Sequence, residues 1–127
     1  MLIYIADDDF TVYEILRPVL EKEGFEVEGF ECGDALLEKF KKRAADLVIL
    51  DVMMPPGPSG FVVCKELRKF SIVPILMLTS RDSDLDYQTA IDLGSDDFFV
   101  KPVNPKIVCA RIRALFRRIR FERSAMI

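Results

Sequence analysis

The sequence contains no histidine, no tryptophan and only three cysteines. Without histidine, the chain has no Ser–His or Cys–His nucleophile pair, no imidazole metal ligand and no phosphohistidine of its own. Cys32, Cys64 and Cys109 lie far apart and form no Cys-x-x-Cys pair, so they suit neither a zinc site nor a disulfide framework, and we expect reduced thiols. Any chemistry must therefore come from carboxylates, hydroxyls, lysine and the backbone.

Long hydrophobic runs are also missing. No stretch approaches the roughly 18–20 consecutive apolar residues that a membrane span needs, and Met1 leads into Leu2–Ala6 without a basic leader or cleavage site. We therefore expect one soluble domain in the cytoplasm, with no membrane partner. Charge is uneven, because residues 1–104 carry 11 basic and 20 acidic side chains whereas residues 105–127 carry 7 and 1. The two parts are expected to face different partners.

Short apolar runs alternate with amphipathic stretches along the chain. The pattern predicts strands at residues 2–6, 25–30, 47–50, 74–78 and 98–100, and helices at 12–20, 34–44, 61–69, 85–93 and from 105 onward. Five strands alternating with five helices predict an α/β fold, a doubly wound parallel sheet with helices on both faces. Ligands of such sheets bind at the carboxyl ends of the strands.

Polar residues follow four of the predicted strands: Asp7–Asp9, Asp51, Thr79 and Lys101. Taken singly, each has an ordinary explanation, since acids can cap a helix and a lysine or threonine can be a surface group. Taken together, they converge on one edge of the sheet. If the first and third strands are neighbours, Asp8 and Asp51 repel each other and need a cation. A set of oxygen ligands favours Mg²⁺ or Mn²⁺ over zinc.

The chain resembles the receiver domain of two-component response regulators over residues 1–122. The resemblance rests on four motifs in order: Ile5–Asp8, Leu47–Asp51 with Pro55, Leu78–Ser80, and Gly94–Pro102. The helix at 110–118 resembles the last receiver helix of the OmpR/PhoB-type (winged-helix) subfamily. The resemblance implies a flavodoxin-like (CheY-like) sheet of order 2-1-3-4-5. Residues 123–127 would begin a linker to an absent C-terminal effector domain.

The resemblance identifies Asp51 as a phosphoacceptor that takes a phosphoryl group from a partner sensor histidine kinase. Such a domain is not an enzyme with a separate substrate, but it catalyses its own phosphotransfer and dephosphorylation. The metal ligands implied for Mg²⁺ (or Mn²⁺) are Asp7, Asp8, Asp51 and Met53, the last through its backbone carbonyl. Lys101 and Thr79 complete the implied catalytic set, because a cation and a hydroxyl donor offset the charge of the phosphoryl oxygens.

The resemblance also implies a switch formed by Thr79 and Phe98. The aromatic ring would turn inward when the threonine moves toward the phosphoryl group, and Phe98 stands where the family more often has tyrosine. The Lys101–Pro102 peptide is expected to be cis, as it typically is in the family.

Two features depart from the family pattern. Gly60 lies nine residues after Asp51 where the family usually has eight, so one residue is added within Pro56–Pro58 and we expect altered kinase docking. Met53 and Arg81 stand at positions that resemble those tuning hydrolysis of the phosphorylated aspartate. We expect slow hydrolysis, since methionine cannot orient a water and arginine can crowd it.

The last predicted helix has an apolar stripe and a basic remainder. The stripe consists of Val108, Ile112, Leu115 and Ile119, while five arginines between 111 and 120 lie off it. We expect no direct nucleic-acid contact by this domain, because the stripe is committed to the core and aromatics for base stacking are missing. A homodimer through the fourth helix, fifth strand and fifth helix is expected instead, with the acids Asp92, Asp96 and Asp97 near that edge.

The favoured function is a phosphorylation-activated switch that controls transcription through a DNA-binding domain outside this chain. The alternatives are a receiver-like interaction module independent of phosphorylation and a stand-alone single-domain regulator. A haloacid-dehalogenase-like phosphatase would need a second acid where Met53 stands. A flavodoxin-like cofactor carrier is disfavoured because Asp7–Asp9 would repel a phosphate at that loop.

Overall fold

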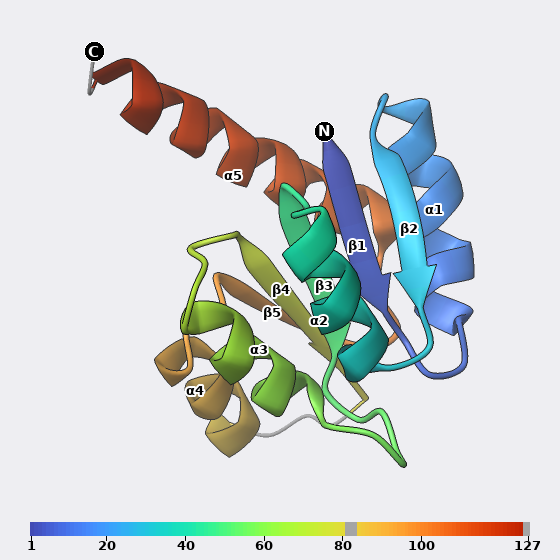
Figure 1. The fold of residues 1–127 in the computed structure, drawn as a ribbon. Coiled ribbons are helices and arrows are strands. Elements are labelled where there is room, and N and C mark those ends of the chain that lie inside the picture. Colours follow the sequence, from blue (N-terminus) through green and yellow to red (C-terminus); the bar gives the residue numbers. More distant parts are fainter. Residues whose placement is uncertain (81–83, 126–127) are drawn as a thin grey trace.

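The computed structural model describes residues 1–80 and 84–125, which form a parallel sheet between two layers of helices (Figure 1). The strands are β1 (Leu2–Ala6), β2 (Glu26–Phe30), β3 (Leu47–Asp51), β4 (Ile75–Thr79) and β5 (Asp97–Val100). The helices are α1 (Thr11–Lys22), α2 (Gly33–Lys42), α3 (Gly60–Arg68), α4 (Asp84–Asp92) and α5 (Pro105–Ala125). The order β2-β1-β3-β4-β5 confirms the predicted fold. No helix in the described ranges is both long and apolar enough to cross a membrane.

The central strands are apolar up to their last residues because both of their faces are covered. Side chains alternate along a strand, so in β1 Ile3 and Ile5 pack toward α1 and α5, while Tyr4 and Ala6 pack toward α2 and α3. All five residues of β1, β3 and β4 are buried. Two apolar layers therefore fix the sheet, and the polar residues that follow each strand are left at its carboxyl edge.

Helix α5 continues past the sheet that anchors it. It begins at Pro105, and the side chain of Asn104 accepts a hydrogen bond from Lys106 N at 3.0 Å, as a helix cap does. The helix extends through Ala125, and its last turns project beyond the strands (Figure 1). Helical structure thus runs past residue 122, where the sequence predicts a linker. Residues 126 and 127 of that linker lie outside the described ranges, and the domain boundary stays a prediction.

Gly60 joins the end of β3 to the start of α3. Its N–H donates to Val52 O at 2.9 Å, and a Cβ at this position would overlap the carbonyl oxygen of Asp51. The departure expected within Pro56–Pro58 lies in the loop before Gly60, and its effect on kinase docking stays a prediction. The absence of a side chain at Gly60 is what lets α3 start directly against the backbone of Asp51.

Substituting Gly60 tests this contact. Gly60→Ala is expected to lower the free energy of unfolding by about 2 kcal/mol or more, because a rigid carbonyl cannot move aside for the methyl group. Gly57→Ala in the same loop is the control, since its nearest atoms would be 3.7 Å away, and we expect a change within about 0.5 kcal/mol. Urea denaturation of both variants measures the difference, and equal losses would contradict the close approach.

Candidate functional site

The strand register brings the predicted site residues to one edge. Ala6 pairs with Leu50, Asp51 with Leu78, and Thr79 with Val100. Parallel strands in this register end at the same level, so the residues after β1 and β5 lie beside the last residues of β3 and β4. The structure therefore assembles Asp7, Asp8, Asp51, Thr79 and Lys101 at the carboxyl edge, as the sequence predicts.

An ion pair between Asp51 and Lys101 crosses the centre of this edge. Lys101 Nζ lies 2.7 Å from Asp51 Oδ2, and the two side chains are 25% and 6% exposed. Burial by itself lowers the pKa of Lys101, but the hydrogen bond to Asp51 and the negative charges of Asp51 and Asp7 outweigh it, so the pKa lies above its usual value. The lysine is therefore a fixed positive charge beside the Asp51 carboxylate.

Asp7 is the most deeply buried acid of the edge. Its side chain is completely buried, and Oδ2 accepts a hydrogen bond from Val12 N in the first turn of α1 at 2.6 Å. Among the described residues, none donates a hydrogen bond to Oδ1. Burial raises the pKa of Asp7 to about 6, against the lowering effect of the Val12 bond and with a further increase from Asp9. One buried oxygen thus faces the edge without a protein donor.

The acidic residues fit a hard divalent cation. Asp7, Asp8 and Asp51 each place a carboxylate oxygen within 4.8 Å of the others. Oxygen donors of this kind match Mg²⁺ or Mn²⁺, and a cation here would bind the oxygen of Asp7 that has no donor. The backbone of Met53 lies beside these carboxylates, since its N–H donates to Asp51 Oδ1 at 3.3 Å. The role of the Met53 carbonyl as a fourth ligand stays a prediction.

Thr79 is the last residue of β4, and Phe98 lies in β5 three residues before Lys101. Thr79 is fully buried, and its carbonyl accepts a hydrogen bond from Lys101 N at 2.7 Å. The ring of Phe98 meets that of Tyr87 in α4 edge to face, with centroids 5.7 Å apart. Sequence reasoning missed Tyr87 as the partner of Phe98. The one feature of the sequence that could have indicated this contact is that Tyr87 is a large aromatic residue on a helix with few other large apolar residues.

Two further expectations concern the segments after β4 and β5. The Lys101–Pro102 peptide is cis, as the resemblance implies. Arg81 lies outside the described residues, so the expectation of slow hydrolysis that rests on it and on Met53 stays a prediction. Met53 itself is 46% exposed at the rim of the edge.

A family model, curated relatives and a solved structure all match this chain over most of its length. A family model described as the response regulator receiver domain matches residues 3–113. The chain is 43% identical to the sensory transduction protein RegX3 of Mycobacterium tuberculosis, over 91% of this chain and 51% of that protein. It is 38% identical to the transcriptional regulatory protein CreB of Escherichia coli, over 93% and 52%. The crystal structure of DrrB, a Thermotoga maritima OmpR/PhoB homolog, superposes with a TM-score of 0.83 at 29% identity, over 92% and 52%.

Removing one acid tests the electrostatics of the edge. At neutral pH and without metal, Asp7→Asn is expected to raise the free energy of unfolding by on the order of 1–2 kcal/mol, because it removes a buried charge with an unsatisfied oxygen. Added Mg²⁺ is expected to raise the melting temperature of the wild type, and to raise that of the variant much less.

The control is Asp34→Asn, which removes an exposed carboxylate from the first turn of α2. This variant should show the same Mg²⁺-dependent rise in melting temperature as the wild type. Calorimetry in EDTA and in excess Mg²⁺ measures all three proteins. An Asp7→Asn variant that gains as much from Mg²⁺ as the wild type would show that Asp7 takes no part in binding the cation.

Proposed function

The chain belongs to the response regulator receiver family, with OmpR/PhoB-type regulators among its relatives, and on that basis we propose that it is a phosphorylation-activated switch. Asp51 accepts a phosphoryl group from the phosphohistidine of a sensor histidine kinase. The observation that carries the proposal is the placement of Lys101 Nζ 2.7 Å from Asp51 Oδ2, beside the oxygens of Asp7 and Asp8.

The proposed reaction is an in-line displacement at phosphorus. A carboxylate oxygen of Asp51 forms the new P–O bond, the P–N bond to the kinase histidine breaks, and its electron pair stays on the imidazole nitrogen. Asp51 is suited to this step because Lys101 and the Met53 N–H hold its two oxygens at 2.7 and 3.3 Å. The carboxylate is thus oriented before the donor arrives, which lowers the entropic cost of reaching the transition state.

Charge is the main obstacle, since an anionic carboxylate must approach an anionic phosphoryl group. Lys101 offsets part of this repulsion with its ammonium group, and its raised pKa keeps that group protonated. Thr79 lies at the end of β4 beside Asp51 and supplies a hydroxyl donor for a phosphoryl oxygen. Asp7, Asp8 and Asp51, with the Met53 carbonyl, would hold Mg²⁺. When bound, the cation neutralises phosphoryl oxygens as a Lewis acid. The same residues serve dephosphorylation by water.

The chain spans about half the length of the curated relatives it matches. We propose that it is the receiver part of a cytoplasmic transcription regulator whose DNA-binding domain lies beyond residue 127. A stand-alone regulator built from this domain only is the alternative, and a phosphorylation-independent module would not need the Lys101–Asp51 arrangement. The receiver is then the input half of the protein, and its output depends on a surface that changes with phosphorylation.

We propose α4, β5 and α5 as that surface, with a second copy of the chain as its partner. Each of these elements exposes apolar side chains: Tyr87 and Ile91 on α4, Val100 on β5, and Ile107 on α5. Arg111 on α5 pairs with Asp97 on β5 within the same chain at 2.7 Å. Exposed apolar groups beside charged ones are typical of an interface that buries its centre and leaves a polar rim.

Phosphorylation is tested by intact mass after incubation with Mg²⁺ and acetyl phosphate. The wild type is expected to gain one phosphoryl group, and Asp51→Asn none. Lys101→Met should be phosphorylated about 10²-fold more slowly, because it removes the charge that stabilises the transition state. Asp46→Asn, at the opposite end of β3, is the control and should react normally. A gain of equal size in Asp51→Asn would exclude Asp51 as the acceptor.

Dimerisation is tested by analytical ultracentrifugation of the phosphorylated chain. Ile107→Glu is expected to weaken the phosphorylated dimer at least about tenfold, because it places a charge at the centre of the proposed interface. Val62→Glu is the matched control, since Val62 is 47% exposed on α3 and belongs to none of these elements. Equal dimerisation of Ile107→Glu and the wild type would place the interface elsewhere.

A further inference from the structure

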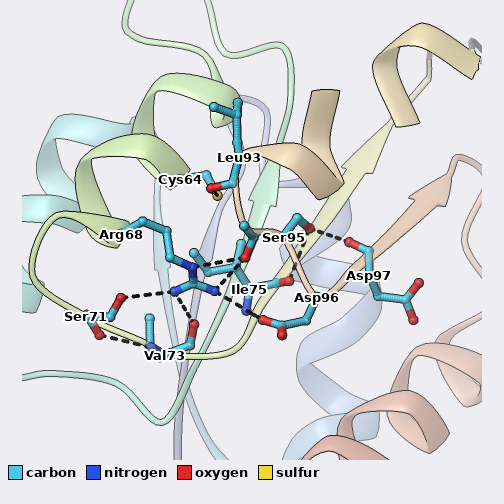
Figure 2. Close-up of polar contacts among 10 residues, drawn as sticks. Cys64, Arg68, Ser71, Val73, Ile75, Leu93, Ser95, Asp96 and Asp97 are labelled. Carbon is cyan, nitrogen blue, oxygen red and sulfur yellow. Dashed lines mark hydrogen bonds and ion pairs between the residues drawn. The ribbon is translucent and has the colours of Figure 1, made fainter. Parts of the chain in front are cut away.

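Arg68, the last residue of α3, links that helix to the α3–β4 connection and to the α4–β5 connection at the amino edge of the sheet (Figure 2). Its Nε and Nη2 donate to Gly94 O at 3.0 and 2.8 Å, and its Nη1 donates to Val73 O at 2.6 Å and Ser71 O at 3.3 Å. Nη2 also lies 3.2 Å from Asp96 Oδ2. The side chain is 22% exposed. Arginine is the residue that can bind several carbonyls at once, because its donors form a rigid planar fork.

Ser95 and Asp96, which follow Gly94, are also held by hydrogen bonds. Asp96 makes two hydrogen bonds to Ile75 at the start of β4. The side chain of Asp96 accepts from Ile75 N at 2.8 Å, and Asp96 N donates to Ile75 O at 2.8 Å. The buried hydroxyl of Ser95 lies 2.6 Å from Asp97 O and 3.3 Å from Ile75 O (Figure 2). These bonds fasten the start of β5 to the start of β4.

The carboxyl end of α4 belongs to the same assembly. Cys64 of α3 is buried, and its Sγ lies 3.6 Å from Leu93 O. Gly94 has φ +106°, and a Cβ there would lie 2.8 Å from Arg68 Nε. Gly94 is therefore required both by its backbone conformation and by the arginine packed on it. We call Arg68, Gly94 and Asp96 together the amino-edge clamp.

The other end of α4 faces Phe98 rather than the clamp. Tyr87 lies in the first turns of the helix, is 53% exposed, and meets Phe98 edge to face with the ring planes at 82°. An aromatic pair with one exposed ring can rearrange at modest cost, since such contacts contribute only about 0.5–1.5 kcal/mol beyond their burial. Ala90 is the one fully buried apolar residue of α4 among those described, and it is small. Among the described residues, the middle of α4 therefore buries little apolar side-chain surface.

We propose that the amino-edge clamp is the pivot about which α4 turns when the receiver is phosphorylated. The inference rests on the proposed function and deepens it by assigning the fixed point of the conformational change. A movement of Phe98 displaces Tyr87, while Arg68 holds Gly94 in place. Tyr87 stands about 10 Å from Gly94 along the helix, so a rotation of about 10° moves it by about 2 Å. The output surface therefore changes most at Tyr87 and least near Gly94.

Residue-resolved NMR of the full 127-residue chain tests the pivot. Amide shifts and hydrogen-exchange rates are recorded before and after phosphorylation by acetyl phosphate and Mg²⁺, with intact mass measured on the same sample. In the wild type, amides of residues 86–91 are expected to change, and those of 93–96 to keep their exchange rates within about twofold. Changes of equal size in both ranges would mean that α4 moves as a whole, and would overturn the proposal.

Variants of Arg68 supply the second arm. Arg68→Ala is expected to increase exchange at 93–96 about tenfold, and to extend the phosphorylation-dependent changes into that range, because several hydrogen bonds to charged donors are lost. Arg68→Lys keeps the charge but not the fork, and is used if the alanine variant fails to fold. Arg43→Ala is the control. It also removes an ion-paired arginine, because Arg43 lies 3.1 Å from Glu26, but in another part of the fold.

The outcomes separate the pivot from the function on which it rests. A sample that gains no phosphoryl mass contradicts the proposed function, and the pivot falls with it. A phosphorylated sample in which Arg68→Ala and Arg43→Ala behave alike contradicts the pivot and leaves the function standing.

Discussion

The ion pair between Lys101 and Asp51 is the interaction on which the rest of the site depends. It joins the central strand β3 to the residue after the edge strand β5, with β4 between them. The 2.7 Å contact forms only if β3, β4 and β5 end at the same level, so it requires the whole carboxyl half of the sheet to be in register. The lysine places a positive charge against a group of carboxylates that would otherwise repel both one another and any phosphoryl donor.

Burial gives this edge its chemical character. Asp7 has no exposed surface and one oxygen without a donor, while Asp51 is almost as deeply buried. A protein does not gain stability from such carboxylates, since desolvation disfavours their charge. Their placement makes sense for binding a cation and an anionic phosphoryl group together. The structure thus gives up some stability at the carboxyl edge and is held firmly at the opposite edge by Arg68.

Local patterns predicted the alternating strands and helices and the convergence of polar residues at one edge, whereas the strand order and the roles of the site residues came from the resemblance to receiver domains. Apolar runs ended by acids located β1 and β3, and the spacing of Asp51, Thr79 and Lys101 relative to their strands predicted their convergence. Gly60 stands out in the sequence by its spacing from Asp51, and in the structure it packs on the Asp51 carbonyl. Strand ends are set by periodicity, and periodicity is visible in a sequence.

The contacts that could not be predicted are those made to backbone carbonyls or across helices. Nothing in the sequence around Arg68 distinguishes it from a surface arginine at the end of a helix, yet it binds carbonyls of Gly94 and Val73. Tyr87 and Phe98 are eleven positions apart and share no pattern. Such contacts depend on how α3 and α4 approach the sheet, which is a property of packing and not of any local motif.

Borohydride reduction of the phosphorylated chain, followed by peptide sequencing, would locate the acyl phosphate directly. The reagent converts a phosphorylated aspartate to homoserine and leaves free carboxylates unchanged. The arrangement of Lys101, Asp7 and Asp8 around Asp51 predicts homoserine at position 51 and at no other acid. Homoserine at Asp7, Asp8 or Asp9 would contradict the assignment of Asp51 as the nucleophile.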